Sequence, residues 1–257
     1  YLSGQVRLAT TIESCRDLGL RQLGDQEINI IDIVRPVTKY AVIVKDPGTI
    51  RYHLEKALYL ATHGRPGPVW LDLPLDIQAA YVDEEKLPKY DPKEDGEGFD
   101  RQLVRKQIAK ALEKLITSER PVLLVGQGIR SAGAVKKLDR MINKLHIPVL
   151  TAISGHDLIG SDHSLFFGRP GICGDRCGNF VIQNSDFLLV IGTRLGIRQI
   201  SYDFKNFASG AFKVMVDIDC AELQKPTLNI NIPVQSDAGF FIDELLSQVK
   251  DIKLHKI

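Results

Sequence analysis

The sequence has 257 residues, of which 44% are hydrophobic and 25% charged, as in an ordinary globular protein. Its 33 basic and 32 acidic residues nearly cancel, which argues against nucleic acid or a membrane surface as a partner. No apolar run approaches the ~20 residues that span a bilayer, so we expect no transmembrane helix. Four cysteines are few for this length and predict free thiols in a cytoplasmic protein.

The first part of the chain alternates short apolar runs with helical patterns. Residues 1–6 are typical of the end of a strand that runs into a polar loop, 7–25. Apolar side chains then follow a helical spacing over 26–34, where Pro36 is expected to end the helix, and 40–44 is a β-branched strand. Strands and helices that alternate in this way indicate a parallel sheet.

Helix 49–62 and strand 69–73 complete this part of the chain. The helix is amphipathic, with its apolar face formed by Ile50, Leu54, Ala57, Leu58 and Ala61. The turn between them is rich in glycine and proline, and we expect it to be structural, with Gly67 at positive φ. Pro74 should stop the strand, which we place centrally in its sheet, because proline cannot donate to a ladder. The next stretch, 83–101, is charged and poor in large apolar residues, which predicts a linker between two domains.

The second part repeats strand, glycine turn, helix and strand, the pattern of a doubly wound Rossmann-like domain. Its predicted strands are 121–125, 148–150, 187–191 and 213–218, and its predicted helices are 102–116, 131–145 and 239–249. In the first of these helices the residues expected to face the core are Val104, Ile108, Leu112 and Leu115. The fold class is therefore α/β: a parallel-sheet Rossmann-like domain preceded by part of a second parallel α/β domain.

The turn after strand 121–125 opens a helix, where free N–H groups and the helix dipole favour a phosphate. Gly126 and Gly128 would let a pyrophosphate approach the backbone, and the amides of 126–130 would bind it, although the spacing is not the G-x-G-x-x-G of NAD sites. A tight turn that binds nothing is an equal alternative. Asp217 ends a neighbouring strand and would suit ribose hydroxyls, and Arg194 would suit phosphates at the same edge. The alternatives are that Asp219, two residues on, is simply a helix N-cap, and that Arg194 is a surface arginine.

Three polar pairs suggest a metal site, but none has the second cluster that a zinc site needs. They are His156-Asp157, Asp162-His163 and Cys173 with Cys177. Solvated loop residues and a buried thiol pair explain them better, so we expect no metal ligand in this chain. The motifs G-x-S-x-G and G-x-x-x-x-G-K-[ST] are also missing, which removes serine hydrolases and P-loop enzymes from the leading interpretations.

Residues 63–78, HGRPGPVWLDLPLDIQ, resemble the end of the first domain in thiamine-diphosphate-dependent enzymes of the acetohydroxyacid (acetolactate) synthase-like large-subunit family. The resemblance covers most of the chain in the same order. It implies that 1–82 is the C-terminal half of a pyrimidine-binding domain, 83–101 a linker and 102–257 the central domain. The family's Q-E pair matches Gln26 and the following glutamate, which puts Gln26 near thiamine and substrate.

In FAD-containing members of the family, the resemblance implies a set of dinucleotide contacts. The matching positions are Arg35, Gly126, Gln127, Gly128, Thr151, Gly168, Gly171, Gly192, Arg194, Asp217 and Asp237. Related enzymes hold ADP or coenzyme A there, or nothing, and two departures bear on the match. Asp25 replaces the aromatic residue usual in acetolactate formers, and Arg194-Leu-Gly-Ile-Arg198 replaces R-F-D-D-R. If the match holds, Gly128→Val should block FAD or ADP binding and leave the fold intact.

The family's activating glutamate and its G-D-G…N motif for magnesium and diphosphate are not in this sequence, so this stretch alone is expected to be inactive. The resemblance implies a parent transferase that uses thiamine diphosphate and Mg²⁺, with FAD or ADP as a further ligand, and forms a homodimer or homotetramer. It would make or break a carbon–carbon bond next to a carbonyl, foremost by condensing 2-oxo acids. Two alternatives stay open: a non-catalytic nucleotide-binding module and an NAD-dependent Rossmann oxidoreductase.

Overall fold

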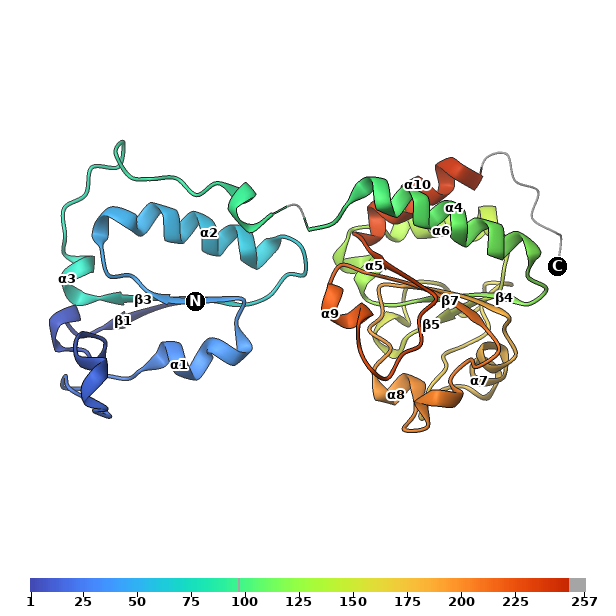
Figure 1. Cartoon of the computed structure of the whole chain (residues 1–257), viewed down its shortest axis with the longest axis horizontal. Helices are drawn as coiled ribbons and strands as arrows, with labels where there is room; N and C mark the ends of the chain where they lie inside the picture. The colour runs from blue at the N-terminus through green and yellow to red at the C-terminus, as the bar shows by residue number, and fades with distance from the viewer. Residues whose placement is uncertain (97, 250–257) are drawn as a thin grey trace. The chain divides into compact units, whose positions relative to one another are not determined.

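The computed structural model describes residues 1–96 and 98–249 of the chain. The chain divides into two compact units, Tyr1–Glu97 and Gly98–Ile257, and the boundary falls inside the charged stretch 83–101. Each unit is built on one all-parallel sheet flanked by helices (Figure 1), which confirms the predicted α/β class. In the described part of the chain, no helix is long and apolar enough to cross a membrane.

The first unit has a three-stranded sheet in the order β1-β3-β2, so the predicted central position of β3 is confirmed. The strands are β1 (Leu2–Gln5), β2 (Tyr40–Ile43) and β3 (Val69–Pro74). Helix α2 (Ile50–Thr62) lies on one face of the sheet and α1 (Ile30–Val34) on the other, and the short α3 (Leu75–Gln78) follows β3 (Figure 1). The carboxyl ends of all three strands therefore share one edge.

Helix α1 is shorter than predicted because it begins later, but it ends at Val34 before Pro36, as predicted. It begins at Ile30, where the side chain of Asn29 accepts a hydrogen bond from the Asp32 amide. A 3₁₀ turn, Arg35–Val37, follows directly after α1. Pro36 is tolerated there because the first amides of a helical turn have no hydrogen-bond partner within the turn, so its missing N–H costs nothing. In α2, two predicted core residues are exposed: Leu54 by 42% and Leu58 by 68%.

The glycine-proline turn before β3 carries its positive φ at Gly64 (+63°), not at Gly67, so that expectation was wrong. A Cβ at Gly67 would meet only the flexible Lys39 side chain, at 3.1 and 3.2 Å. We therefore expect Gly64→Ala to lower the free energy of unfolding by about 1 kcal/mol through backbone strain, and Gly67→Ala to lower it less. Urea denaturation of both variants checks this, and equal losses would contradict it.

Part of the predicted linker packs on helix α2. Tyr90 is only 7% exposed, and its amide donates to the Glu55 carboxylate at 2.9 Å. The Lys56 ammonium lies 5.3 Å from the centre of the Tyr90 ring and 3.2 Å from the Asp95 carboxylate. Residues 90–95 therefore belong to the first unit rather than to a free connection.

The second unit has a five-stranded sheet in the order β5-β4-β6-β7-β8. Its strands are β4 (Pro121–Val125), β5 (Val149–Thr151), β6 (Phe187–Ile191), β7 (Phe212–Asp217) and β8 (Ile232–Gln235). If the strands are numbered within this unit, their order is 2-1-3-4-5, which is a doubly wound order. The direction in which successive strands are added to the sheet reverses beside the first strand. That switch point lies between β4 and β6.

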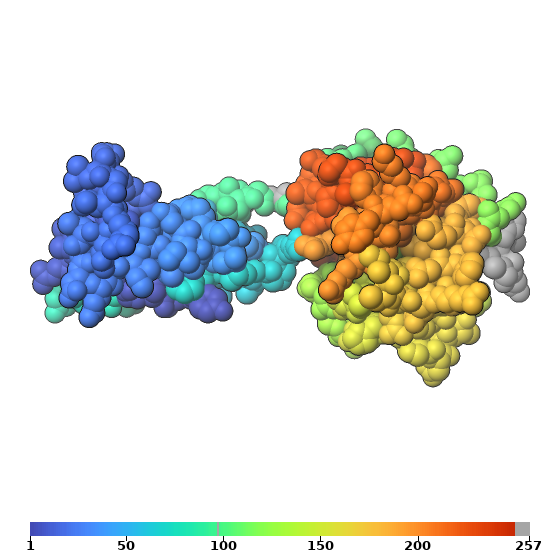
Figure 2. Space-filling model, turned by 90° about the horizontal axis from the view of Figure 1, so that it is seen from below, coloured from blue at the N-terminus to red at the C-terminus, as the bar shows by residue number. Residues whose placement is uncertain are grey.

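Helices cover both faces of this sheet (Figure 1). One face carries α4 (Arg101–Thr117), α6 (Val135–Leu145) and α10 (Ala238–Gln248). The other carries α7 (Arg176–Gln183) and the short α8 (Ile197–Ile200), and Figure 2 shows the yellow and orange segments over this side. Because both faces are covered, β4 and β6 are buried along their whole length. The four predicted core residues of α4 are at most 3% exposed, which confirms them.

Two features of the second unit differ from the sequence prediction. The helix predicted at 131–145 is split into α5 (Gly128–Ser131) and α6, because Gly133 takes a left-handed conformation between them. Strand β8 was not predicted, since Pro233 lies inside it and proline in an apolar run argues against a strand. The structure accommodates Pro233 because β8 is an edge strand.

Candidate functional site at the carboxyl edges of the two sheets

Most of the sequence-predicted site residues lie along the carboxyl edge of the second sheet. The edge carries Gly126, Gln127 and Gly128 after β4, Thr151 at the end of β5, Gly192 and Arg194 after β6, Asp217 at the end of β7, and Asp237 after β8. Gly168 and Gly171 lie in the loop that follows β5. Gln26 and Arg35 belong to the first unit. The carboxyl edge at a switch point is where open α/β sheets bind ligands.

The glycines at the switch point pack against one another. A Cβ on Gly128 would lie 2.6 Å from the Cα of Gly192, and one on Gly126 would lie 2.6 Å from the carbonyl oxygen of Gly192. Gly192 itself has a φ of +66°. These residues must be glycine for the loops after β4 and β6 to meet, whether or not a ligand is bound. The expectation that Gly128→Val leaves the fold intact is therefore wrong.

Four backbone amides of this turn already donate hydrogen bonds within the protein. Those of Gly126, Gly128, Ile129 and Arg130 donate to backbone carbonyl oxygens at distances between 2.8 and 3.1 Å. The expected binding of pyrophosphate by the amides of residues 126–130 is therefore wrong for these four groups. A phosphate at this edge would need side chains as its partners.

Arg194 and Asp217 leave neighbouring strands, and both have partners. The Arg194 guanidinium, with a side chain 60% exposed, lies 3.5 Å from the carboxylate of Glu222 in the short helix α9 (Cys220–Leu223). The Asp217 carboxylate, in a residue 9% exposed, accepts a hydrogen bond from the Asp219 amide at 3.0 Å. Asp219 in turn caps α9, so the N-cap interpretation holds for that residue.

Gly168, Gly171 and Asp237 have structural roles. Gly168 (φ +96°) accepts a hydrogen bond from the Thr151 amide through its carbonyl, at 3.2 Å. Gly171 (φ +139°) is held at both its amide and its carbonyl by the side chain of Asn179, at 2.9 and 3.1 Å. Asp237 caps α10 by accepting a hydrogen bond from the backbone. None of these contacts needs a ligand.

Two buried side-chain atoms in the described residues have no hydrogen-bond partner: the Thr151 hydroxyl and the amide nitrogen of Gln199. Thr151 is 0% exposed. The amide oxygen of Gln199 accepts from the Thr193 hydroxyl at 3.0 Å, and Thr193 packs on Gly126. Buried polar atoms are rarely left unpaired, so this pair is consistent with a polar ligand group or an ordered water at the edge. The family resemblance had selected Thr151, whereas no sequence pattern distinguished Gln199.

We expect Thr151→Val to raise the free energy of unfolding of the ligand-free protein by about 1 kcal/mol, because it removes a buried hydroxyl without a partner. Thermal or urea denaturation without added nucleotide measures this. A clear loss of stability would show that the hydroxyl is hydrogen-bonded in the folded protein.

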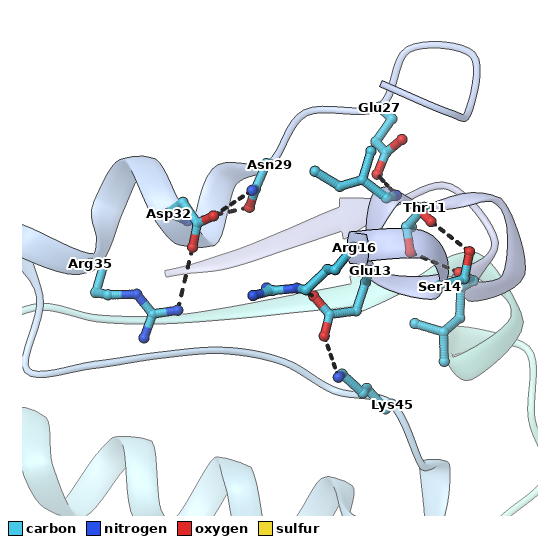
Figure 3. A network of polar contacts seen from close by, with 11 residues as sticks. Thr11, Glu13, Ser14, Arg16, Glu27, Asn29, Asp32, Arg35 and Lys45 are labelled. Atoms are coloured by element: carbon cyan, nitrogen blue, oxygen red, sulfur yellow. Dashed lines mark hydrogen bonds and ion pairs between the residues drawn. The ribbon is translucent and has the colours of Figure 1, made fainter. Parts of the chain in front are cut away.

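A small pocket lies at the carboxyl edge of the first sheet, with a polar lining that includes Gln5, Glu13, Arg16, Glu27, Asn29 and Asp72. Figure 3 shows four of these side chains, Glu13, Arg16, Glu27 and Asn29. Glu13 pairs with Arg16 at 2.5 Å and with Lys45. Burial would raise the pKa of Glu13, but the hydrogen bonds from Lys45 and Arg16 outweigh it and hold the pKa below 4.5. The Glu13 carboxylate is thus held between two partly exposed cations, of which Arg16 lines the pocket and Lys45 does not.

Arg35 and Gln26 lie near this pocket. The guanidinium of Arg35 is 3.4 Å from the Asp32 carboxylate, and its side chain is 62% exposed (Figure 3). Gln26 is exposed in the turn just before Glu27, whose buried carboxylate lines the pocket. Both candidates are therefore accessible from solvent in this unit.

Asp72 is a pocket residue that the sequence reasoning did not select. It is 1% exposed and accepts hydrogen bonds from the Ser3 hydroxyl at 2.6 Å and the Gln5 amide at 3.1 Å. Burial raises its pKa above 3.8, and the two hydrogen bonds only partly oppose this. A carboxylate inside the apolar run 69–73 was a sequence signal for such a site.

The pKa of Asp72 predicts a pH dependence of stability. The folded protein holds the Asp72 proton more tightly than the unfolded chain, so the stabilisation is complete below 3.8 and is lost as the pH rises through the higher folded value. Asparagine does not titrate. Relative to Asp72→Asn, the free energy of unfolding of the wild-type protein should therefore fall as the pH rises above 3.8. Urea denaturation over this range checks it, and a rising or constant difference would contradict it.

The second unit is a doubly wound α/β domain with glycines at its switch point, the place where domains of this class bind their ligands. Residues 108–245 match the family model described as the thiamine pyrophosphate enzyme, central domain. This match covers more than half of the chain. The chain therefore belongs to the thiamine pyrophosphate enzyme family, which confirms the predicted resemblance.

Curated relatives are similar over most of the chain. The probable acetolactate synthase large subunit of Methanocaldococcus jannaschii is 36% identical over 230 residues, 86% of this chain and 37% of that protein. The acetolactate synthase large subunit of Corynebacterium glutamicum is 34% identical over 89% of this chain and 36% of its own length. The glyoxylate carboligase of Escherichia coli is 33% identical over 89% and 38%. The chain thus spans little more than a third of these relatives, and neither alternative interpretation is favoured.

Proposed function

We propose that this chain is part of a thiamine-diphosphate-dependent transferase that condenses 2-oxo acids, forming a carbon–carbon bond next to a carbonyl. The similarity to acetolactate synthase large subunits, at 30–36% identity over 86–90% of the chain, carries this proposal. It extends over both units rather than the central domain alone. When bound, thiamine diphosphate supplies the electron sink that lets a 2-oxo acid lose CO₂ and attack a second carbonyl.

Each unit has its own part in this proposal. Residues 1–82 would form the C-terminal half of a pyrimidine-binding domain, with the Gln26 amide oriented toward thiamine and substrate. Residues 102–257 would be the central domain, and the intact enzyme a homodimer or homotetramer. No group of three or more metal-ligating side chains occurs within residues 1–96 and 98–249, so none of them is assigned to Mg²⁺. The cytoplasmic location is supported by four free cysteines. The expected burial of Cys173 and Cys177 was wrong, because both are exposed.

We also propose that FAD or ADP binds at the carboxyl edge of the second sheet. Thr151 and Gln199 support it, because their buried polar atoms lack partners. The ligand would be held by side chains at this edge, with Arg194 partly exposed for its phosphates, and not by the amides of the glycine turn. Thr151→Val should then weaken binding of the nucleotide while stabilising the ligand-free protein.

The test is release of CO₂ from pyruvate, 2-oxobutyrate and glyoxylate by the intact protein, with and without thiamine diphosphate and Mg²⁺. We expect release that requires both additions. No release from any of these acids by folded, fully supplemented protein would contradict the proposed function. The visible absorption spectrum of the purified protein separates bound flavin from ADP or an empty edge.

A further inference from the structure

The turn 24–27 places Gln26 in an unusual conformation. The Glu27 amide donates to the Gly24 carbonyl at 3.4 Å, so Asp25 and Gln26 occupy the two central positions of the turn. Gln26 has a φ of +60°, and a positive φ at this position is normally taken by glycine or asparagine. Glutamine is strained there, and such strain persists only where the surroundings fix the backbone.

Glu27 supplies that constraint. Its carboxylate accepts hydrogen bonds from the amides of Ile12 at 2.5 Å, Leu23 at 2.9 Å and Gly24 at 3.0 Å. Burial would raise the pKa of Glu27, but the three amide hydrogen bonds outweigh it and hold the pKa below 4.5. The buried, ionised side chain of Glu27 therefore holds the start of the turn next to the loop at Ile12.

The turn is also fixed against the sheet. A Cβ on the buried Gly24 would lie 2.5 Å from the carbonyl oxygen of Thr10, so the backbones are in close contact. On the other side, the Gln5 amide donates to the Ile28 carbonyl at 2.7 Å and to Asp72 at 3.1 Å. The turn thus has a defined position at the carboxyl edge, while the side chain of Gln26 stays exposed.

We propose that Glu27 is a positioning residue, which holds the Gln26 backbone left-handed so that the Gln26 amide donates to a carboxylate or carbonyl oxygen of the 2-oxo acid. This inference rests on the proposed function. A glutamine in a strained backbone conformation is destabilising, and here a buried carboxylate maintains that conformation. This indicates that the direction of the Gln26 side chain is important for function. Glu27 acts only through Gln26 and does not touch the substrate.

The test is a double-mutant cycle in the intact protein with Glu27→Gln, Gln26→Gly and the double variant. Glu27→Gln should lower kcat/KM for the 2-oxo acid about tenfold, and less than about twofold when Gln26 is already glycine. Equal losses in both backgrounds would overturn the positioning role, since they would show that Glu27 acts without Gln26. Glu55→Gln is the matched control, because Glu55 also accepts a backbone amide in this unit, and its effect should be the same in both backgrounds.

Gln26→Gly alone provides a test that does not need Glu27→Gln to fold. It should raise the melting temperature, because glycine relieves the strain, and raise KM, because the amide is lost. A melting temperature that does not rise would overturn the strained turn, and an unchanged KM would overturn the substrate contact. Absence of thiamine-dependent activity in wild-type protein would instead contradict the proposed function, while the melting temperatures would still decide whether the turn is strained.

Discussion

Gly128→Ala is expected to destabilise the second unit by more than about 3 kcal/mol, beyond the usual range for overpacking. The added Cβ would lie 2.6 Å from the Cα of Gly192 and 3.0 Å from its carbonyl oxygen. Both are backbone atoms at the switch point and cannot rotate away as a side chain can. The loops after β4 and β6 would have to separate, with loss of the hydrogen bond from the Gly128 amide to Gly192. Urea denaturation measures the loss.

Gly196→Ala is the matched control for this prediction. Gly196 lies in the loop after β6 with a φ of −68°, and a Cβ there would meet nothing within 4 Å. Its substitution should leave stability unchanged within about 0.5 kcal/mol. If both variants lost the same stability, close packing at the switch point could not be the cause.

Phe241→Ala is expected to cost about 3–5 kcal/mol, because it leaves a cavity in the core of the second unit. Phe241 is 0% exposed and lies in α10, which packs on α4 and α6. It belongs to the core cluster on that face of the sheet. Truncation removes a ring from the layer that holds the three helices together, and equilibrium denaturation should show the loss.

The neighbouring Phe240 is the comparison for that loss. It is only partly buried against the same cluster, and its ring is tilted against that of Phe99, with 5.4 Å between the ring centres. Phe240→Ala should therefore cost less than Phe241→Ala in the same measurement. A larger loss at Phe240 would mean that the core of this unit is not organised around the buried face of α10.

The sequence predicted the buried strands of the second unit best. Strands β4 and β6 have the predicted bounds, because each is an uninterrupted apolar run that ends at a glycine. The prediction failed at β8, where Pro233 masks an edge strand. It also failed for Leu54 and Leu58, since helical spacing shows which residues share a face but not which face is covered.

The sequence predicted that Gly126, Arg194 and Asp217 lie at the carboxyl edge of the second sheet, but it did not predict their contacts. A glycine in a βα turn has the same sequence pattern whether a phosphate or a second loop approaches it. Here Gly192, far along the chain from Gly128, occupies that space. Likewise, the role of Glu27 depends on amides from Ile12 and from the turn itself, which no local pattern brings together. Such contacts follow from tertiary structure alone.

Product analysis of the intact protein tests the central claim most directly. The protein would be incubated with isotopically labelled pyruvate, thiamine diphosphate and Mg²⁺, and the products separated by mass. Condensation predicts a five-carbon hydroxy-oxo acid that carries label from two pyruvate molecules, with one CO₂ released for each product formed. A folded, supplemented protein that converts pyruvate only to CO₂ and free acetaldehyde, or leaves pyruvate and other 2-oxo acids unchanged, would contradict a carbon–carbon bond-forming role.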